Sequence, residues 1–329
     1  MPKIDALFQD FDHPDTPGAA VMVIQNGVIL YEKGYGLADL STKTACSVHT
    51  NFRLASLTKE FTAMAIMMLI EKHQISLDDP ITKFFPEFPK YGVNITIQQL
   101  LNHRSGLLDY EDYIPQGTTI QLSDRDVLHI LMQQDKTYFA PGTQFRYSNT
   151  GYSFLALIVE VASGQTFPAF LKQHIFDPLQ MKQTLAYVQG VSAVPNRAMG
   201  YVKEGDQFKP SDQSLTSAVL GDGGIYTSVE DLYNWDQALY TEKLVSKKML
   251  DQAFTSASSS TDFPDSGYGF GWYVSKYRDT NYLWHYGSTC GFSTHIDRFP
   301  EKKFTVIVLT NRRDAEISDI ARKIADLYF

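Results

Sequence analysis

Ser56 and Lys59 stand three residues apart, just before an apolar run from Phe61 to Ile70. If a helix begins near Ser56, this spacing places hydroxyl and amine on one helical face, within reach of each other. A serine becomes a strong nucleophile when a base removes its proton, and a lysine can be that base if burial lowers its pKa. The spacing therefore predicts an acyl-enzyme, although Ser56 could instead cap the helix while Lys59 extends into solvent.

A second candidate segment, Tyr147-Ser148-Asn149, precedes another helical run. A phenol close to an ammonium group can share a proton with it, so Tyr147 could pass a proton between Lys59 and a leaving group. Asn149 offers an amide donor and acceptor for a substrate carbonyl or for Lys59. The alternative is an ordinary start of a helix with Asn149 as its cap.

The third segment contains His285, Gly287 and Ser288 near the end of an expected strand. A glycine there lets the backbone approach a ligand, and an N–H group of that strand could complete an oxyanion hole with the N–H of Ser56. The alternative is a glycine-rich bend with a partly exposed histidine.

In this order, the three segments resemble the signature of the serine β-lactamase and penicillin-binding-protein superfamily: S-x-x-K, then Y-x-N, then a basic residue, any residue and glycine. Residues 100–107 (LLNHRSGL) and 223–232 (GGIYTSVEDL) resemble two further stretches of that family. The resemblance covers nearly the whole chain and is greatest to the class C-like branch, which includes esterases and D-aminopeptidases.

The resemblance implies a role for each candidate residue. Ser56 is the nucleophile, Lys59 the base and Tyr147 the proton carrier on the leaving-group side. The substrate-binding residues are Asn149, His285, Gly287 and Ser288, and the oxyanion lies between the N–H groups of Ser56 and Ser288. We expect no cofactor and no metal ion.

His285 is the main departure from the pattern, because β-lactamases of this family usually have lysine there. A histidine of ordinary pKa is mostly neutral at pH 7 and would hold a substrate carboxylate weakly. We therefore expect a hydrolase of small esters or D-amino-acid-type amides. The alternatives are a β-lactamase or DD-peptidase, and a non-catalytic penicillin sensor or scaffold.

The rest of the chain predicts an α+β fold. Residues 19–35 contain two β-prone runs joined by Asn26-Gly27, and four further strand candidates lie between residues 267 and 311, followed by an amphipathic helix. Helical spacing covers residues 56–72, 96–102, 124–134, 150–162 and 167–175. We expect one domain over residues 1–329, with a sheet part at about 1–75 and 215–329 and a helical part at about 76–214.

Composition limits the partners. The 329 residues are 43% hydrophobic and carry a formal net charge of −8 without a Lys/Arg cluster, which argues against nucleic acid. The longest apolar run is about half the roughly 20 residues that cross a bilayer. The N-terminus lacks a signal-like apolar core, which predicts a cytoplasmic protein, or an exported one whose leader was removed. The sequence leaves the oligomeric state open.

Several polar residues receive no role. Two cysteines are too few for a disulfide framework. The acidic residues at 109, 111 and 112 are interpreted as a solvated loop whose tyrosines, at 110 and 113, flank the cleft. The histidines at 13, 49, 73, 129, 174 and 295 do not fall at zinc-ligand spacings.

Overall fold

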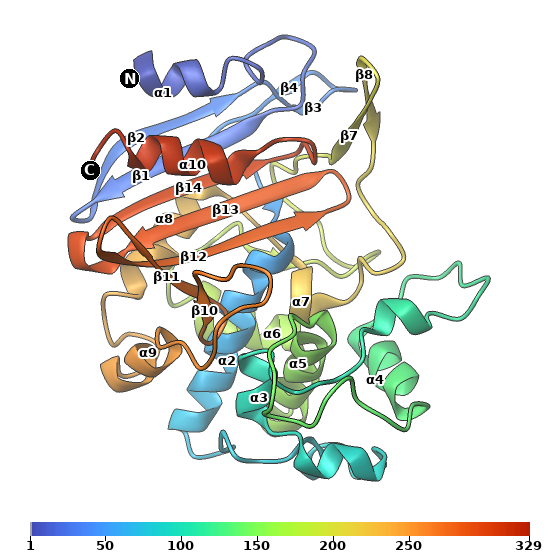
Figure 1. The fold of residues 1–329 in the computed structure, drawn as a ribbon. Coiled ribbons are helices and arrows are strands. Elements are labelled where there is room, and N and C mark those ends of the chain that lie inside the picture. Colours follow the sequence, from blue (N-terminus) through green and yellow to red (C-terminus); the bar gives the residue numbers. More distant parts are fainter. Residues whose placement is uncertain (1) are drawn as a thin grey trace.

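The computed structural model describes residues 2–329, and its central element is a seven-stranded antiparallel sheet in the order β10-β11-β12-β13-β14-β1-β2 (Figure 1). The strands are β1 (Ala19–Gln25), β2 (Val28–Tyr35), β10 (Gly267–Tyr268), β11 (Tyr273–Tyr277), β12 (Thr280–Thr289), β13 (Phe292–Phe299) and β14 (Phe304–Thr310). The first strand pairs with the last, with Ala19 opposite Thr310. The prediction of one sheet built from both chain ends is confirmed.

The N-terminal hairpin turns at Asn26 and Gly27, as expected. Both residues have positive φ, +51° and +76°, which a tight hairpin turn requires and which asparagine and glycine adopt at little cost.

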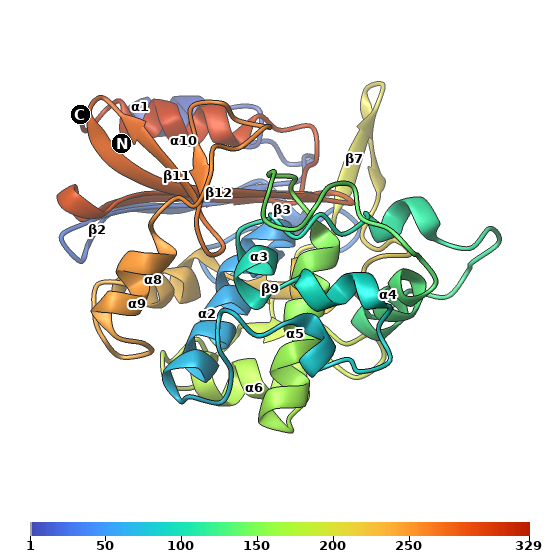
Figure 2. The ribbon, with the colours of Figure 1, turned by 60° about the horizontal axis from the view of Figure 1, so that its bottom comes forward.

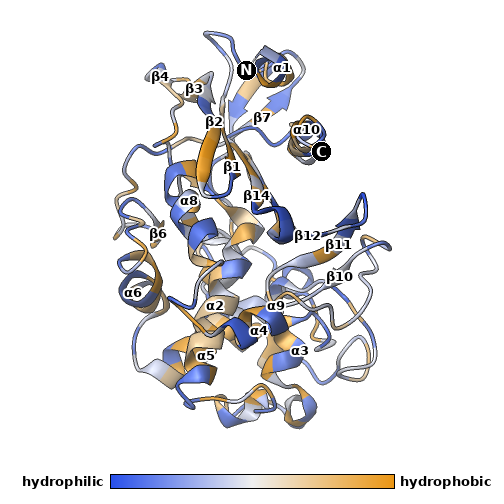
Figure 3. Cartoon of the chain, turned by 90° about the vertical axis from the view of Figure 1, so that its left-hand side faces the viewer, coloured by the Kyte–Doolittle hydropathy of each residue, from blue (hydrophilic) through white to orange (hydrophobic). Residues whose placement is uncertain are grey.

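Helices cover both faces of the sheet (Figure 2). On one face lie α1 (Pro2–Leu7) and α10 (Ile317–Ala325), and on the other lie α8 (Val229–Ala238) and α2 (Thr58–Glu71) (Figure 3). Every residue of β13 and β14 is buried as a consequence. Such double-sided burial matches the near-continuous apolar sequence of β14.

The middle of the chain is mainly helical, as predicted. It contains α3 (Ile97–Leu101), α4 (Asp124–Met132), α5 (Asn149–Ser163), α6 (Phe167–Leu171), a π-helical turn (Lys172–Phe176) and α7 (Leu220–Gly223), and α9 (Lys247–Ala253) follows α8. Helix α2 is buried from Thr58 to Leu69, because it packs between the sheet and the other helices. The predicted α+β fold class is confirmed, while the division into a sheet part and a helical part stays a prediction.

Several short elements were not predicted. They are the pairs β3 (Leu37–Asp39) with β4 (Thr44–Ala45) and β7 (Tyr201–Glu204) with β8 (Gln207–Pro210), the sheet β5 (Phe52–Arg53), β9 (Ile225–Thr227) and β6 (Leu185–Ala186), and 3₁₀ turns at Ala55–Leu57, Ile81–Lys83, Lys90–Asn94, Tyr110–Tyr113 and Pro300–Lys302. Strands of two to four residues are too short to show alternation in sequence.

Two further observations concern covalent and membrane structure. Cys46 and Cys290 are both unpaired. Within residues 2–329, no single helix has the length and apolar character to cross a bilayer, and α5 together with residues Phe167–Phe176 meets that test only as a pair bent by 76°.

Candidate active site

Ser56 lies in the 3₁₀ turn that leads into α2, directly after β5. Pairing of β5 with β9 fixes the chain up to Arg53. Ala55 then has φ of +50°, a strained value for a residue with a side chain, which turns the backbone sharply before Ser56. The helix caps are Leu54 and Leu57, and neither makes a side-chain cap bond. Ser56 therefore does not cap the helix, and it is only half-buried.

Lys59 is fully buried, and three oxygen atoms surround its amine. Its Nζ lies 3.1 Å from Ser56 Oγ, 2.8 Å from Asn149 Oδ1 and 3.0 Å from the carbonyl oxygen of Asp222. The two carbonyl oxygens can only accept hydrogen bonds, whereas the hydroxyl can also donate. A neutral amine with two N–H groups bonded to the carbonyls therefore directs its lone pair at Ser56. The alternative in which Lys59 extends into solvent is excluded.

Burial also lowers the pKa of Lys59, to about 8. Desolvation penalises the ammonium form, and the negative charges of Asp222 and Glu111 oppose this effect only in part. A substantial fraction of Lys59 is thus neutral slightly above neutral pH, which a general base requires.

Tyr147 lies next to Lys59. The amine of Lys59 is 4.9 Å from the centroid of its ring, and the phenol lies near enough to Ser56 for the serine hydroxyl to lower its pKa. Burial raises the pKa of this phenol well above its usual value, more than the contact with Ser56 lowers it. Tyr147 is therefore protonated and able to donate, while Lys59 is able to accept. Two groups whose pKa values are displaced in opposite directions fit an acid and a base.

His103, from the LLNHRSGL stretch, packs against the ring of Tyr147. Its ring lies 4.3 Å from the Tyr147 ring, centroid to centroid. Its Nδ1 accepts the backbone N–H of Ser148 at 3.1 Å. Burial lowers the pKa of His103 well below its usual value, so the ring is neutral and can accept this bond.

Asn149 is the first residue of α5, and Ser148, rather than Asn149, caps that helix by accepting from the N–H of Gly151. The Asn149 amide connects two ionisable groups, because its Oδ1 accepts from Lys59 and its Nδ2 donates to Glu111 Oε1 at 3.0 Å. The interpretation of Glu111 as a solvated loop residue is therefore incomplete. It is exposed, yet it faces the catalytic amide.

Gly287 allows β12 to approach the turn that carries Ser56. A Cβ atom at this position would lie 2.2 Å from the Leu54 carbonyl oxygen and 2.9 Å from the Ser56 nitrogen. Pairing of β11 with β12 ends at Trp284, so this edge of β12 has no neighbouring strand beyond that residue in the part of the chain that the structure describes. Ser288 lines the same cavity as Ser56. The structure thus brings both predicted oxyanion donors to one cavity.

His285 does not face the cavity. It is fully buried, its Nδ1 lies 2.7 Å from the Tyr286 carbonyl oxygen, and its Nε2 lies 2.9 Å from the Tyr268 hydroxyl. Burial lowers its pKa to about 3, and the nearby charge of Lys59 adds to that shift. His285 is therefore neutral, as expected, but both ring nitrogens bind protein groups. Its contact with substrate, predicted from the motif, requires a correction: the ring holds β12 and Tyr268 in position instead.

The cavity beside Ser56 has a volume of about 70 Å³. Its lining comprises Arg53, Ala55, Ser56, Tyr110, Glu111, Asn149, Thr216, Asp222, Gly223, Ser288 and Thr289. Of the two tyrosines expected to flank the cleft, Tyr110 lines this cavity and Tyr113 does not. Burial raises the pKa of the Asp222 carboxyl.

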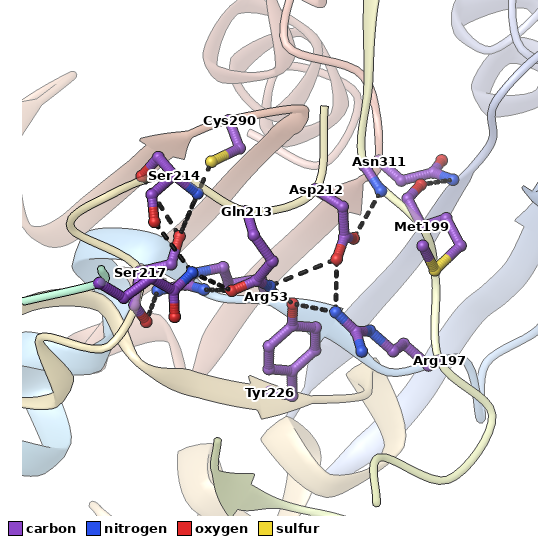
Figure 4. A network of polar contacts seen from close by, with 12 residues as sticks. Arg53, Arg197, Met199, Asp212, Gln213, Ser214, Ser217, Tyr226, Cys290 and Asn311 are labelled. Atoms are coloured by element: carbon purple, nitrogen blue, oxygen red, sulfur yellow. Dashed lines mark hydrogen bonds and ion pairs between the residues drawn. The ribbon is translucent and has the colours of Figure 1, made fainter. Parts of the chain in front are cut away.

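Arg53 contributes the only guanidinium among the lining residues. It donates to the Ser217 carbonyl oxygen at 2.8 Å and lies 3.4 Å from Gln213 Oε1, within the network of Figure 4. Neither Arg53, Glu111 nor Asp222 was singled out as functional from the sequence, because nothing local to these residues indicates that their segments meet at Ser56.

Comparisons with known proteins agree with this geometry. The sequence profile of the family described as Beta-lactamase matches residues 4–328. Penicillin-binding protein 4* of Bacillus subtilis (strain 168) is 32% identical over 339 residues, which cover 98% of this chain and 74% of that protein. Protein flp of Staphylococcus aureus (strain MW2) is 30% identical over 318 residues, which cover 94% of this chain and 62% of that protein.

A solved structure extends the comparison to the fold. D-amino acid amidase from Ochrobactrum anthropi SV3, in complex with L-phenylalanine amide, matches with a TM-score of 0.84 and 23% identity, over 100% of this chain and 99% of that chain. At this identity, the likeness shows a shared fold.

Proposed function

This chain belongs to the β-lactamase family and is a serine hydrolase, and from that premise we propose that it forms an acyl-enzyme through Ser56 and hydrolyses small esters or D-amino-acid-type amides. The observation that supports this proposal best is the 3.1 Å distance from Ser56 Oγ to the buried amine of Lys59, which itself lies 4.9 Å from the ring centroid of the protonated Tyr147.

In the proposed reaction, Ser56 Oγ attacks the substrate carbonyl carbon while its proton moves to neutral Lys59. The N–H groups of Ser56 and Ser288 bind the oxyanion. Tyr147 protonates the leaving oxygen or nitrogen as its bond to carbon breaks, and Lys59 returns the proton to Tyr147. A water molecule then gives a proton to Lys59 and attacks the acyl ester, which releases the acid and restores the Ser56 hydroxyl.

The charges of the cavity bear on the substrate class. Glu111 is an exposed carboxylate of this cavity, whereas burial raises the pKa of the Asp222 carboxyl and the guanidinium of Arg53 is oriented toward Ser217 and Gln213. His285 is neutral and does not reach the cavity. A substrate with an amino group near the scissile carbonyl would find a carboxylate, whereas the carboxylate of a β-lactam would meet repulsion. This balance supports aminoacyl amides and neutral esters over β-lactams. The D-amino acid amidase that shares the fold fits this class.

A direct test compares turnover of a p-nitrophenyl ester, D- and L-phenylalanine p-nitroanilide, and nitrocefin. We expect kcat/KM for the ester and the D-anilide to exceed that for nitrocefin by about tenfold or more, because one repelled charge costs at least about 1.4 kcal/mol in a partly desolvated site. Nitrocefin as the best substrate would instead identify a β-lactamase. A lasting penicillin adduct without any turnover would identify a sensor.

A further inference from the structure

Ser318, His295 and Asp297 form a hydrogen-bonded chain outside the cavity of Ser56. The Oγ of Ser318 lies 2.9 Å from Nδ1 of His295, and Nε2 of the same ring lies 2.5 Å from Oδ1 of Asp297. His295 and Asp297 are buried on β13, whereas Ser318 is partly exposed in the first turn of α10. A hydroxyl, an imidazole and a carboxylate in this sequence are the components of an activated nucleophile.

Asp297 determines the tautomer of His295. A carboxylate accepts hydrogen bonds, so Nε2 carries the hydrogen, and the lone pair of Nδ1 is directed at Ser318. Tyr282 donates to the same oxygen of Asp297. The ring of Trp284 lies 6.0 Å from the His295 ring, centroid to centroid, at an angle of 28°. These contacts fix the imidazole and leave one nitrogen able to take the Ser318 proton.

A cavity of about 660 Å³ adjoins the Ser318 hydroxyl. Ser318 and His295 line it together with the aromatic side chains of Phe263, Trp284 and Tyr286. It extends along β12 to Gly287 and Ser288 and shares Ser288 with the cavity of Ser56, but α10, which carries Ser318, and α2 lie on opposite faces of the sheet (Figure 3). The space and its aromatic wall would accommodate a small aromatic compound.

The start of α10 adds a place for negative charge. Its N-cap residue, Glu316, makes no side-chain cap bond. The N–H of Ile317 donates to the Ala315 carbonyl oxygen at 2.9 Å and that of Asp319 to the Glu316 carbonyl oxygen at 3.1 Å. The N–H of Ser318 itself is therefore the group of this turn that can stabilise an oxyanion forming at Ser318.

We propose that Ser318 is a second nucleophile of this chain, acting on small aromatic esters that bind in the cavity beside α10. Ser318 Oγ bonds to the ester carbonyl carbon while its proton moves to Nδ1 of His295. The carbon–oxygen bond to the phenol then breaks, and the same proton goes to the departing phenolate. Water releases the acyl group as the acid and restores the Ser318 hydroxyl, with His295 again carrying the proton.

The alternative is that the Ser318–His295 contact only attaches α10 to the sheet. That helix already has buried apolar residues for this purpose, namely Ile317, Ala321, Ile324 and Ala325. A purely structural serine would not react with electrophiles, so chemical labelling separates the two roles.

The test uses the full chain carrying Ser56→Ala, treated with an aryl fluorophosphonate and analysed by peptide mass spectrometry. We expect one adduct, on Ser318, and slow release of p-nitrophenol from p-nitrophenyl acetate. Both should disappear in Ser56→Ala/Ser318→Ala. Both should persist in Ser56→Ala/Ser293→Ala, because Ser293 lines the same cavity but donates to the Arg313 carbonyl oxygen at 3.3 Å and does not contact His295.

His295→Gln in the Ser56→Ala background should slow labelling of Ser318 by about 100-fold, the typical effect of losing a general base. If this buried substitution prevents folding, comparing Ser56→Ala/Ser318→Ala with Ser56→Ala/Ser293→Ala still distinguishes a nucleophilic Ser318 from a structural one. An unlabelled Ser318 in folded Ser56→Ala protein, or labelling that survives Ser318→Ala, would overturn the proposal.

Discussion

The amide oxygen of Asn149 lies 2.8 Å from the amine of Lys59, closer than the hydroxyl oxygen of Ser56 at 3.1 Å. The same amide donates to Glu111 at 3.0 Å, so a carboxylate at the mouth of the cavity is connected to the buried amine through one side chain. The proton affinity of Lys59 consequently depends on both burial and the charge of Glu111.

Activity should increase with pH up to about 8. Lys59 acts as a base only when it is neutral, and its pKa is about 8, so kcat/KM should rise about tenfold per pH unit below that value and level off above it. Lys59→Arg should remove the rise and lower kcat by about 10² to 10⁴-fold at every pH, because a guanidinium does not lose its proton. A flat wild-type profile between pH 6 and 8 would be inconsistent with Lys59 as the base.

Glu111→Gln should shift the rise of kcat/KM with pH to lower pH. The negative charge of Glu111 raises the pKa of Lys59, and glutamine keeps an oxygen for the Asn149 bond while removing the charge. The same variant should lose about tenfold in kcat/KM for D-phenylalanine p-nitroanilide relative to its analogue without the amino group, since a hydrogen bond to a charged group contributes about 1.5 kcal/mol.

Asp112→Asn is the matched control, because that carboxylate faces the Tyr138 hydroxyl at 3.4 Å and is not among the residues that line the cavity. Equal effects of the two substitutions would show that general loss of negative charge, rather than the position of Glu111, is responsible.

Gly287→Ala should separate β12 from the turn of Ser56. A Cβ atom 2.2 Å from the Leu54 carbonyl oxygen cannot be accommodated without movement of the backbone. We expect kcat to fall by about 10² to 10³-fold, the usual effect of losing one oxyanion donor. Gly151→Ala is the control, since its Cβ would meet its nearest neighbour at 3.5 Å. Unchanged kinetics in a folded Gly287→Ala protein would refute the assignment of Ser288 as an oxyanion donor.

Protonation of His285 on unfolding should lower the free energy of unfolding in mild acid relative to pH 7. Its pKa is about 3 in the folded state and about 6.5 when unfolded, so the unfolded chain binds the additional proton between these values. The stability that neutral His285 contributes is complete above pH 6.5 and decreases as pH falls toward 3. Urea unfolding should show a loss of about 2 kcal/mol from pH 7 to pH 5 that His285→Gln lacks. The control is His13→Gln at an exposed position. An equal acid dependence in wild type and His285→Gln would contradict this prediction.

The sequence predicted best those features that depend on local spacing. The interval from Ser56 to Lys59 placed both side chains on one face, and Asn26-Gly27 predicted the first hairpin, since helical periodicity and turn preference are local properties. The alternation and apolar character of the C-terminal strands similarly predicted the sheet.

Features that depend on long-range packing could not be predicted. Glu111 follows a tyrosine in a polar segment, and only the approach of that segment to the start of α5 shows that it faces Asn149. The motif at His285 suggested contact with substrate, but the Tyr268 hydroxyl that binds its ring comes from another strand. Ser148 and Asn149 are both good cap residues, and their sequence alone does not indicate which one caps α5.

The most direct measurement follows covalent chemistry at Ser56 in a Ser318→Ala chain, which removes the second proposed nucleophile. The protein is mixed with excess p-nitrophenyl ester, quenched in acid within the first turnover, and analysed by peptide mass spectrometry. We predict an acyl group on Ser56, together with a fall in turnover of about 10⁴-fold or more on Ser56→Ala at an unchanged Tm. An acyl group on another residue, or turnover that survives Ser56→Ala, would contradict the central claim.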